Sequence, residues 1–301
     1  MRIVSLLPSA TEIVFALGAG SDLVGRSDEC DYPAPVRSLP AIMTPKVRDT
    51  DRPSREIDAR VRASLASSES LYRLDLGLLA KLAPDVLLTQ DLCRVCSVTD
   101  DEVRAACRAA GVSPEILSLS PRSLREVWES IETIGRSIGR AGAGRLLSEA
   151  LAGRAARRRP RVAGGTDRPS VAVIEWVDPP ILAGLWTPEI VAAAGGRAVG
   201  VPGGASARRV GWDDLARASP DLVIVSPCSF GVPRTRAEVA DPSVRTGLSS
   251  LAPSLGTWLA DEAYFSRPGP RLAYGIDLIE ALLRGVPGGF PMPVERWPSG
   301  S

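Results

Sequence analysis

The sequence predicts an α/β protein of two lobes, each with a parallel sheet, joined by one long helix. Two stretches, 78–90 and 214–226, share a pattern of a short helix, a Pro-Asp turn and an apolar strand. Continuous apolar strands that follow helices are typical of parallel sheets covered on both faces. A long segment with helical spacing of its apolar residues separates the two copies. This order predicts two α/β layers with a helical connection between them.

The first lobe begins with a strand over 2–7 and a helix over 11–20, in which Gly18 stands where a helix C-cap belongs. A second strand over 22–27 follows. The helix and strand of 78–90 come next, with the strand at 85–89.

The second lobe repeats this order. A strand over 170–177 precedes a helix over 188–196, where Glu189-Ile190-Val191 match Glu12-Ile13-Val14 and Gly195 takes the C-cap position. A strand over 221–226 follows Pro220-Asp221. Strand, helix, strand, helix and strand therefore occur twice.

The connection over 123–160 keeps helical spacing of its apolar residues, with glycines at 142 and 144 that predict a kink and Pro160 as its end. We therefore predict an N-terminal lobe over 1–122, a bridging helix over 123–160 and a C-terminal lobe over 161–286. The remaining residues, 287–301, are expected to be a tail that is packed on the surface or disordered.

The composition is that of a globular protein, with 45% apolar and 24% charged residues and a net charge of +1. No basic run is interleaved with aromatic residues, so we expect no nucleic-acid partner. No stretch approaches the roughly 20 apolar residues of a membrane span. The apolar run near the start is broken by Pro8 and lacks a signal-peptide pattern, so we expect a cytoplasmic protein.

The chain has no histidine and five cysteines. The absence of histidine excludes Ser-His-Asp and Cys-His catalysis and every histidine-based metal site. Ligands of open parallel sheets bind beyond the carboxyl ends of the strands. Four cysteines follow predicted strands there, namely Cys30, Cys93, Cys96 and Cys228, whereas Cys107 falls within a helix and is predicted to be a core thiol.

Three interpretations of Cys30, Cys93 and Cys96 stay open. They are small buried residues of tight loops, or thiolate ligands of Zn²⁺ or an iron–sulfur cluster, or a redox pair or nucleophile. In a metal site, Cys228, Glu29 or a bound ligand would complete the coordination. In an enzyme, Glu29 would be the general base because no histidine is present.

Aromatic residues gather in the same predicted loops: Tyr32, Trp176, Trp186, Trp258 and Tyr264. This pattern favours a flat or apolar ligand, and core packing beneath the loops is the alternative. The candidate ligand-binding residues are Asp28, Glu29, Tyr32, Gln90, Trp176, Asp178, Trp186 and Cys228.

Several motifs run in order along the chain: "SLLPSATEI", "ECDYP", "LAPDVLLTQDLCRVC", "AGLWTPEIVAAAGG" and "YFSRPGPRLAYGIDLIEALL". Together they resemble the cobalamin and iron-siderophore substrate-binding proteins of ABC importers, over roughly 1–285. The match is best to a cobalamin-binding-like branch that carries "ECDYP" and Cys-x-x-Cys. The resemblance implies two Rossmann-like lobes bridged by one long helix, as in class III periplasmic binding proteins, with the ligand in a cleft between the lobes.

The chain departs from that branch at two positions where the branch usually has histidine, here Asp28 and Leu185. Exported cobalamin binders also lack the Cys-x-x-Cys pair. Without export, an ABC permease is an unexpected partner.

Three functions follow as hypotheses. The first is a cytoplasmic binding protein for a corrinoid, a metal chelate or another bulky ligand in the interlobe cleft. The second is a cysteine-dependent or metal-dependent enzyme on the same scaffold, with Zn²⁺ or an iron–sulfur cluster. The third is a protein-interaction module.

Overall fold

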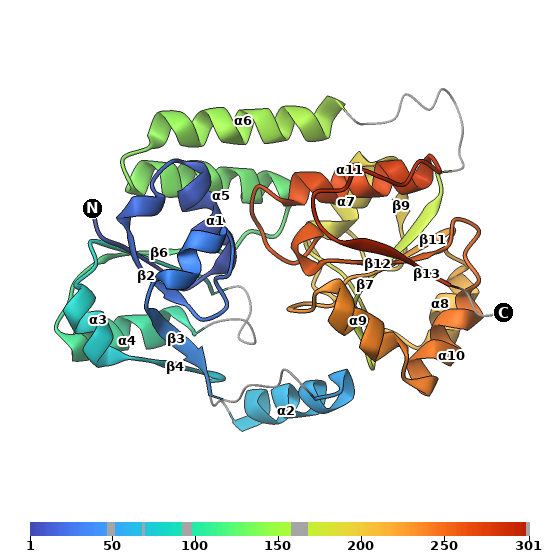
Figure 1. The fold of residues 1–301 in the computed structure, drawn as a ribbon, viewed down its shortest axis with the longest axis horizontal. Helices are drawn as coiled ribbons and strands as arrows, with labels where there is room; N and C mark the ends of the chain where they lie inside the picture. The colour runs from blue at the N-terminus through green and yellow to red at the C-terminus, as the bar shows by residue number, and fades with distance from the viewer. Residues whose placement is uncertain (47–51, 68–69, 92–97, 158–167, 299–301) are drawn as a thin grey trace. The chain divides into compact units, whose positions relative to one another are not determined.

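A computed structural model describes residues 1–46, 52–67, 70–91, 98–157 and 168–298. The chain forms two compact units, each built around one sheet (Figure 1). Unit 1 comprises Met1–Arg52, Ala59–Pro121 and Arg125–Ala150. Unit 2 comprises Pro53–Asp58, Arg122–Leu124 and Leu151–Ser301. Among the described residues, no helix combines the length and the hydropathy that crossing a membrane requires.

The sheet of unit 1 has the strand order β4-β3-β2-β1-β5-β6, and all pairs are parallel except β3 with β4. The strands are β1 (Ile3–Ser5), β2 (Leu23–Ser27), β3 (Ala41–Pro45), β4 (Tyr72–Leu74), β5 (Val86–Thr89) and β6 (Glu115–Ser118). β1 and β5 are fully buried along their length, as the apolar runs predict.

The helices of unit 1 follow from local signals. Helix α4 (Asp100–Ala110) begins at a capping box of Thr99 and Glu102 and ends at Gly111, whose φ of +69° suits glycine. It buries Val103, Ala106 and Cys107, so Cys107 is a core residue as predicted. Further helices of unit 1 are α1 (Pro8–Ala16), η1 (Gly20–Asp22), η2 (Ala34–Ser38) and α3 (Leu76–Leu82), while α2, α5 and α6 are described below.

The sheet of unit 2 has the order β10-β8-β7-β11-β12-β13, with β9 also beside β7. Its centre, β9, β7, β11 and β12, is parallel, and β8, β10 and β13 pair antiparallel. The strands are β7 (Ser170–Val177), β8 (Pro180–Leu182), β9 (Arg197–Ala198), β10 (Arg208–Arg209), β11 (Leu222–Val225), β12 (Thr257–Ala260) and β13 (Val294–Trp297).

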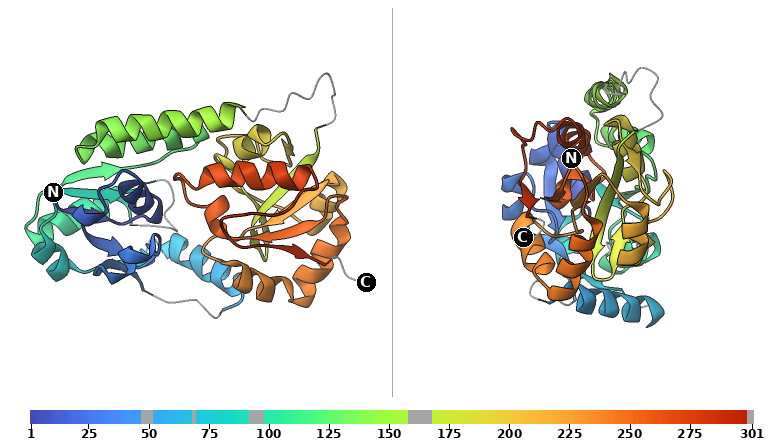
Figure 2. Two further views of the ribbon diagram at one scale, coloured as in Figure 1. Left: turned by 45° about the horizontal axis from the view of Figure 1, so that its top comes forward. Right: turned by 90° about the vertical axis from the view of Figure 1, so that its right-hand side faces the viewer.

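Helices cover both faces of this sheet (Figure 2). On one face, α8 (Trp212–Ala218), α9 (Val232–Val239) and α10 (Pro242–Leu251) bury apolar side chains against β7 and β11 in one core cluster. On the other lie α7 (Thr187–Ala193) and α11 (Leu272–Leu283), which contact each other. A short helix, η3 (Glu262–Tyr264), follows β12.

The predicted internal repeat is confirmed in atomic detail. α3 and α8 both end at a residue in the left-handed region, Ala83 with φ +38° and Ser219 with φ +43°. The aspartate two residues later accepts a backbone N–H at the start of the central strand in each unit. Asp85 accepts from Arg2 at 2.7 Å, and Asp221 accepts from Ser170 at 2.7 Å.

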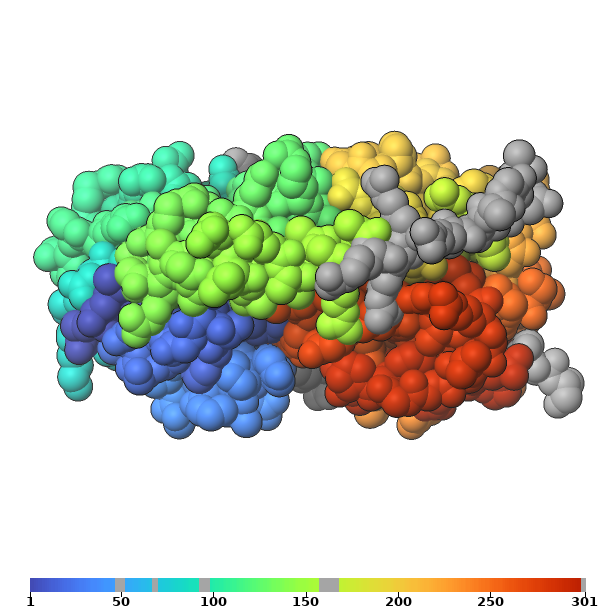
Figure 3. All heavy atoms as spheres, turned by 90° about the horizontal axis from the view of Figure 1, so that it is seen from above, coloured from blue at the N-terminus to red at the C-terminus, as the bar shows by residue number. Residues whose placement is uncertain are grey.

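The prediction of one helix over 123–160 needs a correction. The structure has two helices there, α5 (Leu124–Ser137) and α6 (Ala141–Arg157). The chain turns at Gly139, whose φ is +68°, and Arg140 donates its N–H to the Gly135 carbonyl. Gly144 lies within α6 and close to α5: a Cβ at this position would stand 3.1 Å from the Ile131 carbonyl oxygen. Most residues of α6 up to Ala150 face outward, and the helix lies open in Figure 3.

The C-terminal tail also needs a correction. Val294–Trp297 form β13, which pairs with β12 and extends the sheet of unit 2. Trp297 is buried in the core of that unit because the added strand places its indole over the sheet. Trp258, expected in a loop, lies within β12.

Candidate functional site

In unit 1, β2 ends at Ser27 and is followed by the loop 28–33. Arg26 fixes the start of this loop by donating to the carbonyls of Ser27 at 2.9 Å and Asp28 at 3.0 Å. The Ser27 hydroxyl accepts the Glu29 N–H at 3.3 Å. The loop then presents Tyr32, which is 49% exposed, before a cis bond to Pro33. The loop at this carboxyl edge of the sheet therefore carries two carboxylates and one half-exposed aromatic ring.

Cys30 points inward from the same loop and is fully buried. Its sulfur accepts the Thr11 hydroxyl at 3.1 Å and lies 3.9 Å from the Ser5 carbonyl oxygen. These contacts fit the interpretation of a small residue in a tight loop. Among the described residues, no group of three cysteine or acidic side chains is placed to hold a metal ion. Cys93 and Cys96 lie outside the described residues, so the metal, redox and nucleophile interpretations stay predictions.

Gln90 follows β5 directly and is half-buried. The next residue, Asp91, donates its backbone N–H to the Ser120 hydroxyl at 3.3 Å. Gln90 therefore lies at the carboxyl end of its strand, as Asp28 and Glu29 do at the end of β2, two strands away in the sheet.

In unit 2, β7 ends with Trp176 and Val177, and Asp178 follows, joined to Pro179 by a cis bond. The Trp176 ring packs against Phe230 with centroids 5.2 Å apart. The Trp176 indole N–H donates to the Ser54 carbonyl at 3.3 Å. The two predicted ligand residues of this strand are thus close together, in contact with a segment from the start of the chain.

That segment, Pro53–Asp58, will be called the α2 arm because it begins helix α2 (Ser54–Ser67) and belongs to unit 2. Its Arg55 lies 3.8 Å from Asp178 and donates to Asp241 at 3.0 Å. Burial raises the pKa of Asp178, and the carboxylates of Asp241, Glu238 and Asp58 raise it further, while Arg55 lowers it. Sequence reasoning missed this group because its members come from three distant parts of the chain.

Cys228 follows β11 and is half-buried. Its N–H donates to the Glu175 carbonyl at 3.1 Å, and its thiol donates to the Ser266 hydroxyl at 3.4 Å. The next residue, Ser229, has a φ of +64°, a strained conformation that is frequent at functional sites. The structure thus places Cys228 at the end of its strand, as predicted, on a turn of fixed shape.

A buried ion pair lies beside this turn. Glu262 is 8% exposed and accepts the Ser229 N–H at 3.3 Å. Arg267 donates its Nε to Glu262 at 2.6 Å. Burial raises the pKa of Glu262, and the Arg267 guanidinium opposes that shift. The motif "YFSRPGPR" contains Arg267, but the sequence does not show which carboxylate this arginine pairs with.

The remaining aromatic candidates, Trp186, Tyr264 and Trp258, pack within unit 2. Trp186 is 5% exposed and donates its indole N–H to the Phe265 carbonyl at 2.6 Å, so little of its surface is open to a ligand. Tyr264 is fully buried and donates its hydroxyl to the Met292 carbonyl at 2.8 Å, and burial raises its pKa to about 12. Arg296 stacks over Trp258. For Tyr264 and Trp258, core and edge packing explain the aromatic residue.

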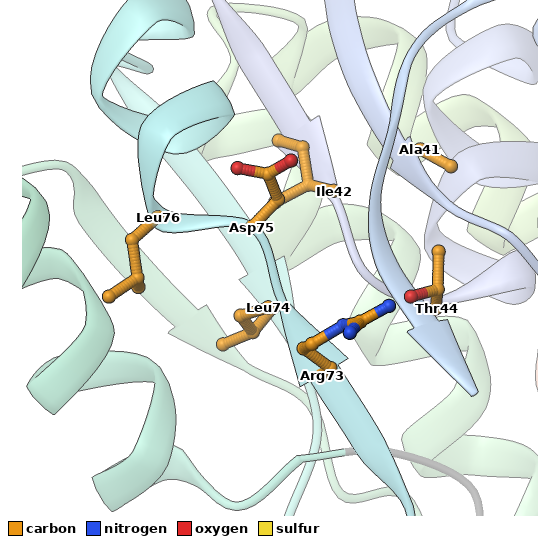
Figure 4. A pocket seen from close by; sticks show the side chains of 7 residues that line it. All are labelled: Ala41, Ile42, Thr44, Arg73, Leu74, Asp75 and Leu76. Carbon is orange, nitrogen blue, oxygen red and sulfur yellow. The ribbon is translucent and has the colours of Figure 1, made fainter. Parts of the chain in front are cut away.

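A hollow of about 410 Å³ lies elsewhere in unit 1, along β3 and β4 (Figure 4). The side chain of Arg73 extends toward Thr44, while Leu74 points away from it. Asp75 lines the hollow and caps α3 by accepting the Leu78 N–H at 2.8 Å. None of the residues predicted to bind a ligand lines this hollow.

Comparison with known proteins identifies the fold. No protein-family model matches the chain, and no curated protein sequence matches it significantly. Solved structures match it from end to end. A periplasmic heme-binding protein from Pseudomonas aeruginosa has a TM-score of 0.70 and 19% identity, covering 97% of this chain and 96% of that one.

Two further structures show the same likeness. The periplasmic heme-binding protein RhuT from Roseiflexus sp. RS-1 has a TM-score of 0.65 and 23% identity, covering 95% of this chain and 99% of that chain. The periplasmic vitamin B12-binding protein BtuF of Vibrio cholerae has a TM-score of 0.61 and 18% identity, covering 95% and 97%. The chain therefore has the α/β fold of the class III periplasmic binding proteins, as its sequence predicts.

Proposed function

We propose that the protein binds a bulky, flat, cofactor-like small molecule, and that a corrinoid is its ligand. One observation carries this proposal: in each unit, a strand of the sheet leads at its carboxyl end into a segment that holds both an aromatic side chain and a carboxylate. Asp28, Glu29 and Tyr32 follow β2 in unit 1, and Trp176 and Asp178 lie at the end of β7 in unit 2. Aromatic faces suit a flat ring, and a few polar groups fix its orientation.

Charge favours a corrinoid over heme. The edge of a corrin ring carries amide groups, which donate hydrogen bonds to carboxylates. Heme carries two propionates, which the Glu29 carboxylate disfavours. Arg26 lies 3.9 Å from Asp28 and Arg55 lies 3.8 Å from Asp178, so these arginines offset the charge of the two aspartates. The structural neighbours described as heme-binding and vitamin B12-binding proteins support a ligand of this general size.

The test is a titration of the full chain with hydroxocobalamin and with hemin, followed by visible absorption and by calorimetry. We expect corrinoid binding tighter than heme binding. Tyr32→Ala should weaken corrinoid binding at least tenfold, a loss of about 1.4 kcal/mol. Leu146→Ala is the matched control, because Leu146 is a similarly exposed apolar side chain on α6. Tighter binding of heme would overturn the choice of ligand, and binding of neither would overturn the function.

Elemental analysis of the same protein, purified without oxygen, tests the enzyme alternative. A binder should carry no stoichiometric zinc or iron. Metal that is lost in Cys93→Ser would instead support the metal-dependent enzyme, because thiolate ligands hold such metals directly.

We further propose that the protein works in the cytoplasm, without an ABC permease. The support is the odd number of cysteines, five, which does not suit a fully paired extracellular framework. Fractionation of cells that produce the protein tests this location. Recovery with the periplasmic fraction, where the structural neighbours are described to work, would contradict it.

A further inference from the structure

The α2 arm is held on unit 2 by its backbone. Ser54 is 1% exposed, and its N–H donates to Glu238 at 2.9 Å. Its carbonyl accepts the Trp176 indole N–H at 3.3 Å. The Glu238 carboxylate thereby caps the first turn of α2, where a negative charge also favours the helix dipole. The arm is thus bound by the same residues that end β7 and α9.

Charged side chains add to this contact on both sides of the arm. Arg209 of β10 donates hydrogen bonds from two nitrogens to the Asp58 carboxylate, at 2.6 and 3.3 Å. Such bidentate pairs are strong and directional. Arg55 lies between Asp178 and Asp241, whose negative charges repel each other without it. Arg234 donates to the second oxygen of Glu238 at 2.6 Å.

The α2 arm belongs to unit 2, whereas the segments directly before and after it in the sequence belong to unit 1. Met1–Arg52 before it and Ala59–Pro121 after it belong to unit 1. The two arginines of these contacts are partly exposed, Arg55 at 56% and Arg209 at 43%, so water reaches both guanidinium groups, whereas Ser54 is buried. The exposed arginines are therefore the part of the contact that water can replace if the start of α2 leaves unit 2.

We propose that the α2 arm is a latch over the ligand residues of unit 2. Docked, it uses the indole N–H of Trp176 and neutralises Asp178 with Arg55; released, it leaves both to a ligand. This inference rests on the proposed function, because it assigns the regulation of the same site. The apparent affinity of such a site is reduced by the fraction of molecules in which the latch is closed.

The experiment compares the wild-type chain with Arg209→Ala and Arg55→Ala. Arg208→Ala is the matched control, because Arg208 is the neighbouring exposed arginine of β10 and its guanidinium lies against Gly200. Hydrogen exchange of peptides that cover residues 53–58 reports docking. Hydroxyl-radical footprinting, read by mass spectrometry at Trp176, measures how far the arm shields the Trp176 ring from solvent, and it needs no ligand. Stopped-flow mixing with hydroxocobalamin reports access to the site.

We expect both test variants to exchange faster in the arm, to oxidise faster at Trp176 and to bind hydroxocobalamin at least threefold faster than wild type. Arg208→Ala should match wild type in all three. Unchanged exchange of the arm would overturn the docking, and slower or equal association despite a mobile arm would overturn the latch. If no variant binds hydroxocobalamin, the proposed function fails, and the oxidation of Trp176 alone then decides whether the arm covers it.

Discussion

Glu262 illustrates how one residue couples stability to pH. Its carboxylate is buried with Arg267, and removing one partner of a buried pair costs about 3–5 kcal/mol. Arg267→Ala should therefore lower the free energy of unfolding by about that amount near neutral pH. Without the guanidinium, burial raises the pKa of Glu262 further above its unfolded value. The loss should then shrink as pH falls through the raised pKa, because the protonated acid tolerates burial.

Urea unfolding between about pH 4 and pH 8 measures this loss. Adding Glu262→Gln to Arg267→Ala should remove the pH dependence, since the amide keeps an acceptor for Ser229 and carries no charge. Arg284→Ala breaks an exposed pair with Glu280 and should cost less than about 1 kcal/mol. An equal loss for Arg267→Ala at every pH would contradict the explanation.

The positions of residues at strand ends could be predicted from the sequence, but the surroundings of their side chains could not. Tyr32, Asp178 and Cys228 could be located because an apolar run marks where each strand ends. Trp186 and Tyr264 could not be recognised as interior residues, because their burial depends on elements that are distant in sequence. The partners of Glu262 and Asp178 were hidden for the same reason.

At the scale of elements, we expect alanine substitutions at two glycines of α6 to have opposite effects on stability. A Cβ on Gly144 would lie 3.1 Å from the Ile131 carbonyl oxygen, so Gly144→Ala should force α5 and α6 apart and cost about 1–3 kcal/mol. Gly142 has no atom within 4 Å of its Cβ position, so Gly142→Ala should stabilise by roughly 0.5 kcal/mol. Thermal unfolding of the two variants measures both effects, and stabilisation by both would show that the helices do not meet at Gly144.

The same region shows what periodicity cannot reveal. The apolar spacing over 123–160 predicted helix correctly, but a tight turn needs only one residue with positive φ, and Gly139 supplies it. Among several glycines, the sequence does not mark which one turns and which one packs. β13 was missed because a four-residue edge strand between prolines carries almost no pattern, although Trp297 is buried.

For the whole molecule, each unit contains a core cluster formed by its own residues, so we expect unfolding in more than one step. Trp297→Ala removes a large side chain from the core of unit 2 and should cost about 3–5 kcal/mol there. Leu87→Ala should cost about 2–5 kcal/mol in unit 1. Calorimetry should show each variant shifting a different transition. A single transition that both variants shift equally would contradict independent cores.

The position of the α2 arm in the chain also bears on synthesis. Arg55 precedes its partner Asp241 by 186 residues. A growing chain folds its N-terminal part first, at about 5–20 residues per second, so the arm leaves the ribosome seconds before Asp241 exists. The six strands of unit 1 can pair in that interval, while the arm has no partner from unit 2. Unit 2 therefore includes a segment made near the start of translation, and a fragment that begins at Leu151 would never receive it.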